Sequence, residues 1–93
     1  MREIVVLPSF ERSARKLNLP DKNHLVESVE QFYNFVLTGE LPVGLGFKKI
    51  GPDKYEFRAG LRSRVLVKAE GDTYYLVFVG SHDEVSRYLR GKA

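Results

Sequence analysis

The sequence predicts one α+β domain over residues 1–93, in which an N-terminal strand and a helical hairpin pack on a mostly antiparallel sheet. Apolar residues between positions 25 and 37 recur with the 3.6-residue period of a helix. The segment from 47 to 79 instead consists of short apolar or alternating runs separated by turns that contain glycine. No internal repeat, low-complexity segment or linker divides the chain. The expected order of elements is β-α-α-β-β-β-β-α.

The N-terminal residues predict a strand and a first helix. Residues Arg2–Leu7 predict a short strand that Pro8 ends. Ser9 is the expected N-cap of the helix, because a serine side chain can bond the free N–H groups of a first turn. The apolar face of this helix is Phe10, Ala14 and Leu17.

A second, longer helix follows the break at Asn18–Pro20. Residues Asp21–Asn23 are its expected caps, and Gly39 stands where a left-handed C-cap is expected. Its apolar residues are Leu25, Val26, Val29, Phe32, Tyr33, Val36 and Leu37. Two helices with one apolar face each predict a hairpin packed on the sheet.

Four strands and a last helix follow the loop at 40–46. The expected strands are Phe47–Ile50, Tyr55–Ala59, Ser63–Ala69 and Thr73–Val79. The last of these is apolar on both faces, as a covered interior strand would be. Ser81 and Glu84 have the spacing of a capping box, which predicts a final helix that turns Val85 and Leu89 inward.

Composition narrows the class of protein. The chain is 43% hydrophobic and 29% charged, as in ordinary globular domains. It has no cysteine, which excludes disulfides, thiolate metal sites and cysteine nucleophiles. No His, Asp or Glu cluster has metal-ligand spacing, so neither a metal nor another cofactor is expected. The apolar runs are too short to span a bilayer and no export signal is present, so we expect a cytoplasmic protein without membrane association.

The net charge of +3 is unevenly distributed. Residues 1–46 hold five Lys/Arg and six Asp/Glu, whereas residues 47–93 hold ten and six. The basic excess therefore lies in the C-terminal half, which indicates a surface for a polyanion, although a solvated sheet can carry the same charges.

The C-terminal half also carries a series of short motifs. They are Phe47-Lys48-Lys49-Ile50, Tyr55-Glu56-Phe57-Arg58, Arg62-Ser63-Arg64-Val65-Leu66, Val79-Gly80-Ser81-His82 and the later Tyr88. In this order they resemble the RelE/ParE toxin superfamily, and the resemblance covers essentially the whole chain. It implies a toxin of a type II toxin–antitoxin system that cleaves mRNA on the ribosome without a metal, and a cognate antitoxin as partner.

Cleavage of RNA through its 2′-hydroxyl needs a base, an acid and cations that stabilise the phosphoryl oxygens. His82 is the acid/base candidate, since histidine changes charge near neutral pH. The family has arginine at this position in its better-studied members, so His82 acts either as a proton donor or as a cation. Arg58 and Arg64 are the candidate phosphate ligands, because guanidinium binds phosphate through two donors. Tyr88 is the fourth catalytic candidate, as a ring that stacks on a base or as a weak acid, unless it belongs to the core.

A second set of basic residues is expected to attract ribosomal RNA without base specificity. It comprises Lys48, Lys49, Lys54, Arg62 and Lys68. Glu56 is interpreted as positioning a neighbouring arginine; several active family members have lysine there, so the acid here predicts a weaker enzyme. His24 is expected to lie outside the site.

Two other functions stay open. The same fold hosts toxins that inhibit DNA gyrase, which would need no acid/base residue. A degenerate toxin that binds only its antitoxin, and DNA as a co-repressor, is also compatible with Glu56 and His82.

Overall fold

The computed structural model describes residues 2–91 and has the expected order of elements. The strands are β1 (Glu3–Val6), β2 (Lys48–Lys49), β3 (Lys54–Ala59), β4 (Ser63–Glu70) and β5 (Thr73–Gly80). The helices are α1 (Pro8–Arg15), α2 (Leu19–Thr38) and α3 (His82–Gly91). The strands form one sheet in the order β1-β5-β4-β3-β2, with β1 parallel to β5 and the other neighbours antiparallel. The predicted α+β class and mostly antiparallel sheet are confirmed.

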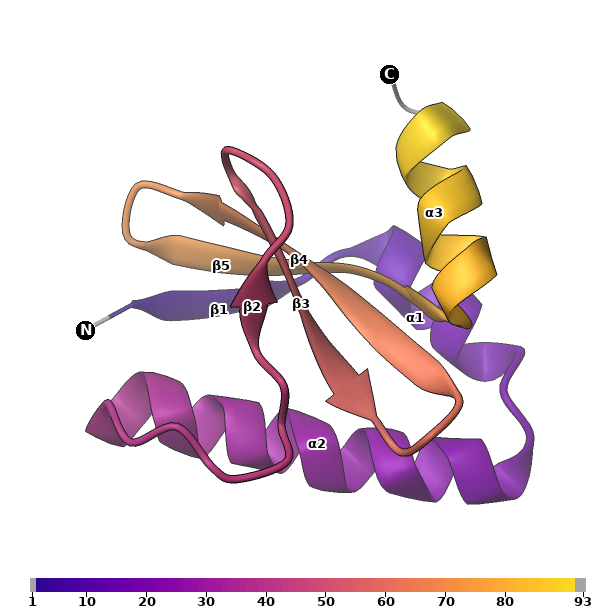
Figure 1. The fold of residues 1–93 in the computed structure, drawn as a ribbon, viewed down its shortest axis with the longest axis horizontal. Coiled ribbons are helices and arrows are strands. Elements are labelled where there is room, and N and C mark those ends of the chain that lie inside the picture. The colour runs from indigo at the N-terminus through magenta and orange to yellow at the C-terminus, as the bar shows by residue number, and fades with distance from the viewer. Residues whose placement is uncertain (1, 92–93) are drawn as a thin grey trace.

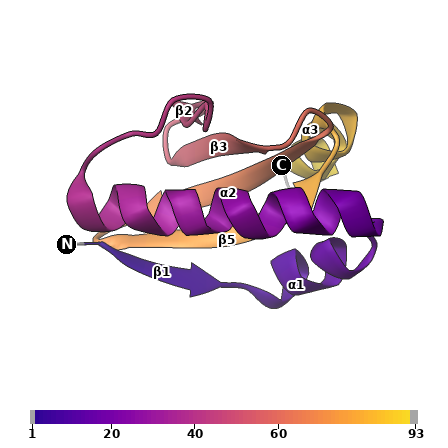
Figure 2. The same ribbon diagram turned by 90° about the horizontal axis from the view of Figure 1, so that it is seen from below.

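The helical hairpin and α3 cover different parts of the sheet (Figure 1). Helix α2 runs along the sheet, and α3 projects from the end of β5 on the side away from it (Figure 2). On β4, Val65 and Val67 face α2, while Leu66 between them points to the opposite face. All three are at most 1% exposed. Strand β4 is therefore covered on both faces.

The core beneath α2 is dominated by aromatic rings. The buried rings of Phe32 and Phe57 stack with centroids 4.8 Å apart. Around them lie Phe35, Phe47, Tyr55 and Tyr74. Such pairs add to the free energy of burial through favourable ring geometry. This core fixes β3, whose alternate residues Glu56 and Arg58 must then face away from α2.

The first predicted N-cap is wrong. Helix α1 begins at Pro8, which suits the first helical turn because proline lacks the N–H that would stay unpaired there. The cap position is Leu7, which gives no side-chain hydrogen bond. The Ser9 hydroxyl instead donates to the carbonyl of Val77, 2.6 Å away, so a contact distant in sequence decides its role.

The second helix begins earlier than expected. Asn18 is its N-cap, and the side-chain oxygen accepts from the N–H of Asp21 at 2.9 Å. Leu19 and Pro20 were expected to lie in the break between the two helices. They instead form the first turn of α2. The predicted left-handed C-cap at Gly39 is confirmed, with φ of 80°.

Two serines of α1 complete the edge of β5 where β1 ends. Strand β1 pairs with residues 73–76, so the next part of β5 lacks a strand neighbour on that side. There Ser9 bonds the carbonyl of Val77, and the buried Ser13 hydroxyl accepts from the N–H of Val79 at 3.0 Å. Side-chain hydroxyls thus replace strand partners for backbone groups that would otherwise be unpaired.

A β-bulge prepares the end of β5. Leu66 pairs with Phe78 while Val67 pairs with Leu76, so Val77 is an extra residue opposite the register shift. The shift brings Gly80 opposite Arg64, and α3 begins two residues later. Bulges commonly redirect side chains beside functional sites.

Candidate active site

A pocket of about 320 Å³ lies on the sheet face opposite α2. Its lining residues are Gly46, Phe47, Lys48, Glu56, Arg58, Arg64 and His82. Strand register explains this grouping. Lys48 pairs with Glu56, Arg58 pairs with Arg64, and Arg64 pairs with Gly80, so β2, β3, β4 and the start of α3 converge. Three of the four predicted catalytic residues, His82, Arg58 and Arg64, lie in this one pocket.

Arg58 and Arg64 are cross-strand neighbours on β3 and β4. Like charges placed directly opposite each other repel, so this pair is unfavourable unless an anion lies between or beside them. The Arg58 side chain packs over Gly46, where an added Cβ would lie 3.2 Å from its Cγ. Gly46 also has φ of 67°, so both its backbone and its missing side chain suit the place it occupies.

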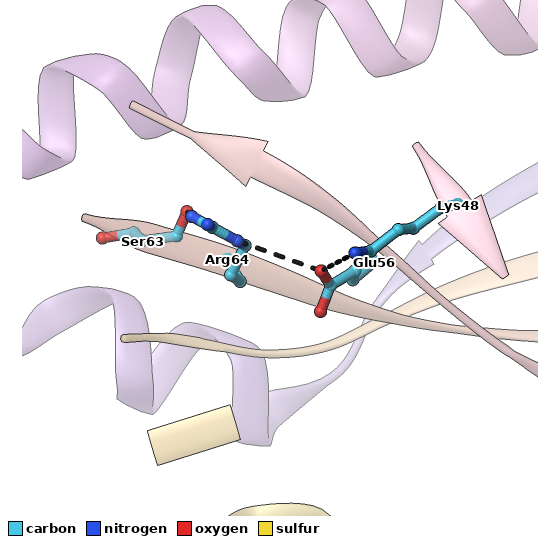
Figure 3. Close-up of polar contacts among 4 residues, drawn as sticks. All are labelled: Lys48, Glu56, Ser63 and Arg64. Atoms are coloured by element: carbon cyan, nitrogen blue, oxygen red, sulfur yellow. Dashed lines mark hydrogen bonds and ion pairs between the residues drawn. The ribbon is translucent and has the colours of Figure 1, made fainter. Parts of the chain in front are cut away.

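Glu56 lies between Lys48 and Arg64 (Figure 3). Its Oε2 is 3.7 Å from Nζ of Lys48 and 3.9 Å from Nε of Arg64. Its side chain is 9% exposed, against 21% for Arg64 and 67% for Lys48. A buried carboxylate is tolerated when cations compensate it. The sequence interpretation that Glu56 lies beside an arginine agrees with this geometry.

The position of His82 depends on the capping box before it. The N–H of Ser81 donates to Oε1 of Glu84 at 2.8 Å, and the N–H of Glu84 donates to the Ser81 hydroxyl at 3.1 Å. The predicted capping box is confirmed. It starts α3 at His82, whose exposed side chain lines the pocket.

Tyr88 lies apart from this pocket. Its ring stacks on Phe78, with centroids 4.5 Å apart and planes 17° apart, and it is half-buried. It lines a neighbouring hollow of about 330 Å³ together with Lys54, Lys68 and Leu66. The ring of Tyr88 thus packs on the sheet, and its role in RNA binding or catalysis stays a prediction.

The remaining basic residues are dispersed. Lys48 is part of the pocket, whereas the exposed Lys49 pairs with Tyr55 and lies outside it. Lys54 bonds Asp53 at 3.0 Å, and this hydrogen bond holds the pKa of Asp53 below its ordinary value. Arg62 is exposed in the turn before β4, and Lys68 lies 3.9 Å from Glu70.

His24 packs against the turn between β3 and β4. An added Cβ on Gly60 would lie 2.8 Å from its Cγ. His24 therefore lies outside the pocket, as expected. Within residues 2–91, no three His, Asp or Glu side chains are grouped as metal ligands would be. No helix in that range is long and apolar enough to cross a membrane.

Solved structures with related folds are found at low sequence identity. A chain of the RelB–RelE antitoxin–toxin complex from Methanococcus jannaschii matches with a TM-score of 0.69 and 19% identity, over 90% of this chain and 96% of that one. A chain of the E. coli DinJ–YafQ complex gives 0.67 and 12%, over 91% and 98%. YafQ from E. coli BL21(DE3) gives 0.64 and 11%, over 91% and 98%.

The protein has the RelE-like toxin fold. The resemblance seen in the sequence is therefore confirmed at the level of the fold. No family model matches the sequence, and no curated protein matches it at a significant level. In this chain, the loop before β2 and the ends of β3, β4 and β5 converge on one pocket whose lining contains several cationic side chains.

From the sequence, Glu56 was interpreted only as a residue that positions a neighbouring arginine, whereas the structure places it in the lining of the pocket. The signal was present, because strand alternation puts Glu56 and Arg58 on one face. Gly46 and Phe47 were not expected in the site. Their placement depends on the loop at 40–46, where the N–H of Arg58 donates to the carbonyl of Leu45 at 2.8 Å. No local pattern marks such a contact.

Proposed function

We propose that this protein is the toxin of a type II toxin–antitoxin system and a ribosome-dependent endoribonuclease that cleaves mRNA. The observation that carries the proposal is the pocket that groups His82 with Arg58 and Arg64. An imidazole that can transfer a proton beside two guanidinium groups supplies the acid and the cations that phosphodiester cleavage requires. The fold shared with RelE and YafQ supports it.

The reaction proposed is attack of a ribose 2′-oxygen on the adjacent phosphorus, with loss of the 2′-hydroxyl proton to water. Arg58 and Arg64 bind the phosphoryl oxygens and stabilise the charge that develops on them. His82, as imidazolium, donates its proton to the leaving 5′-oxygen. The products are a 2′,3′-cyclic phosphate and a 5′-hydroxyl. A DNA strand is not a substrate, because it lacks the 2′-hydroxyl.

The partners proposed are an antitoxin, the ribosome and its mRNA, in the cytoplasm. Two of the matched structures are antitoxin–toxin complexes, which supports an antitoxin. The basic excess in residues 47–93 supports approach to ribosomal RNA, since such attraction acts over about 8 Å at physiological salt. Lys49, Lys54, Arg62 and Lys68 contribute only this general attraction.

The proposal is tested by controlled expression followed by genome-wide mapping of transcript 5′-ends. We expect new 5′-ends inside translated codons, and their loss in His82→Ala and in Arg64→Ala. Arg15→Ala is the matched control, because Arg15 is exposed on α1 and lines neither the pocket around Arg58 and Arg64 nor the hollow beside Tyr88. It should cut like the wild type.

The other two functions give different results in the same experiment. A gyrase inhibitor would arrest growth with intact transcripts and accumulating DNA breaks. A degenerate homologue would cause no arrest, although it would still copurify with an antitoxin. Either result contradicts the proposed cleavage of mRNA.

A further inference from the structure

Helix α2, which lies on the outside of the sheet, carries a row of apolar side chains that the core does not use (Figure 2). Leu19, Val26 and Tyr33 are 69%, 58% and 43% exposed. They are spaced seven residues apart, close to two helical turns, so they lie in line along the helix. Leu25 and Phe32, one position earlier in each case, are buried in the core. An aligned row of exposed apolar residues indicates an interaction surface, whereas scattered ones do not.

Two charged side chains belong to the same row. Lys22 and Glu30 are exposed, and they lie four residues before and after Val26 on the same side of the helix. Among residues 2–91, neither side chain has an ion-pair partner. They cannot pair with each other, because residues eight apart on a helix are separated by about 12 Å along its axis. Each charge is therefore open to a group on a partner.

The order of these side chains is symmetric about Val26. Leu19 and Tyr33 lie about 10 Å from Val26 along the helix axis, on opposite sides, and the two charged residues lie about 6 Å from it. A second α2 that runs antiparallel across a twofold axis at Val26 brings Leu19 of each chain to Tyr33 of the other. Lys22 of each chain likewise meets Glu30 of the other. Two apolar contacts and two ion pairs then flank the centre.

We infer that a second copy of this chain covers the row, packed as an antiparallel α2–α2 pair. Charge complementarity is the reason for this choice, because each free charge on the row meets its opposite without a second kind of protein. A twofold interface uses one surface twice and needs such self-complementarity. The charges also set the direction of packing, since a parallel pair in register would place Lys22 against Lys22 and Glu30 against Glu30.

The α2–α2 dimer leaves the candidate active site open. Helix α2 packs on one face of the sheet, and the pocket that contains Arg58 and Arg64 lies on the other. No residue of α2 lines that pocket. The dimer is therefore independent of the proposed cleavage of mRNA, and it can be tested with the purified chain alone.

Charge reversal tests the ion pairs. The Kd of the dimer is measured by sedimentation equilibrium at low and high salt, for the wild type and for Lys22→Glu and Glu30→Lys. We expect the wild type to dimerise. Each reversal should raise the Kd roughly 10- to 100-fold at low salt, because both ion pairs of the dimer become repulsions. The difference should shrink at high salt, which screens exposed charges.

A mixture of the two reversed variants tests the symmetry. The Lys22→Glu chain carries glutamate at both positions, and the Glu30→Lys chain carries lysine at both. Each variant alone places like charges opposite each other, whereas a pair of unlike variants places glutamate opposite lysine at every charged contact. We expect an equimolar mixture to form a heterodimer about as tight as the wild-type dimer. Only a second copy packed about Val26 predicts this recovery.

Val26→Glu tests the centre of the interface, where two carboxylates would meet at the twofold axis. It should give a monomer with the wild-type circular dichroism spectrum, because Val26 is exposed. Glu70→Lys, at the end of β4, changes the net charge as Glu30→Lys does and should dimerise like the wild type.

Three results contradict the inference. A dimer that survives Val26→Glu, or a mixture of the reversed variants that stays monomeric, overturns the pairing through α2. A wild-type chain that stays monomeric at high micromolar concentration overturns the second copy as the occupant and assigns the row on α2 to a different protein, such as an antitoxin.

Discussion

At the scale of single residues, Arg64 shows how a side chain is held ready for an anion. It is one-fifth exposed, lies opposite Arg58, and has the Glu56 carboxylate 3.9 Å from its Nε. Its Nη1 also donates to the carbonyl of Ser63 at 3.3 Å. These contacts hold the guanidinium plane before a ligand arrives, which reduces the entropy lost on binding.

Arg64→Lys keeps the charge and removes the planar pair of donors. Loss of one charge-assisted hydrogen bond costs about 1.5–3 kcal/mol, so we expect ribosome-dependent cleavage to fall by roughly 10- to 100-fold. Single-turnover cleavage on programmed ribosomes measures this. Arg62→Lys, in the exposed turn before β4, is the matched control and should cleave normally. Equal rates for Arg64→Lys and the wild type would show that Arg64 supplies only charge.

The site residues differ in how far the sequence alone predicted their place and role. Arg58, Arg64 and His82 were named from the family resemblance and from the chemistry of RNA cleavage, and strand alternation and the capping box account for their place in one pocket. The role of Tyr88 was left open, because the partner of its ring, Phe78, depends on how α3 docks. The centrality of Glu56 was underestimated, since it follows from register with Lys48 and Arg64 rather than from its own strand.

At the scale of elements, side chains of α1 take the place of a neighbouring strand at the edge of β5. Ser9 and Ser13 supply hydrogen bonds to the part of β5 that contains the bulge and leads into α3. The helix therefore stabilises the sheet edge that ends beside His82. Sequence reasoning found the helix but assigned Ser9 to a cap, because the hydroxyl partner lies 68 residues away.

Ser13→Ala should destabilise the fold. It leaves the N–H of Val79 buried without its partner, which costs about 1–3 kcal/mol in the free energy of unfolding, less about 0.5 kcal/mol gained from the helix propensity of alanine. Urea denaturation followed by circular dichroism measures the change.

The control for that change is Ser86→Ala on α3, whose hydroxyl makes no hydrogen bond within the described residues 2–91. It should be neutral or slightly stabilising. Equal stability of the two variants would mean that the contact between α1 and β5 contributes nothing measurable.

Element boundaries show where local patterns fail. The four strands from β2 to β5 and the C-terminal end of α2 were predicted within about two residues, because apolar patterns and turn residues mark them. The start of α2 was placed too late, since Pro20 was interpreted as a break although proline is favourable in a first helical turn. The cap that decides the matter is Asn18.

At the scale of the whole molecule, the residues that stabilise the fold and the residues that line the pocket lie in different places. Helix α2 and the aromatic core occupy one face of the sheet, while the pocket lies on the other. The N-terminal half carries α1, α2 and a slight negative charge, and the C-terminal half carries α3, most of the pocket and the basic excess. Charged residues can therefore accumulate around the pocket without entering the core that holds the sheet together.

The cleavage chemistry is tested most directly by replacing one ribose in the mRNA. Programmed ribosomes are incubated with the wild-type protein and an mRNA that carries a single 2′-deoxynucleotide on the 5′ side of the mapped cut. We expect the unmodified mRNA to be cleaved to a 2′,3′-cyclic phosphate and the substituted mRNA to stay intact at that position. Cleavage of the substituted mRNA at the same linkage would contradict a reaction through the 2′-hydroxyl, and with it the roles given to Arg58, Arg64 and His82.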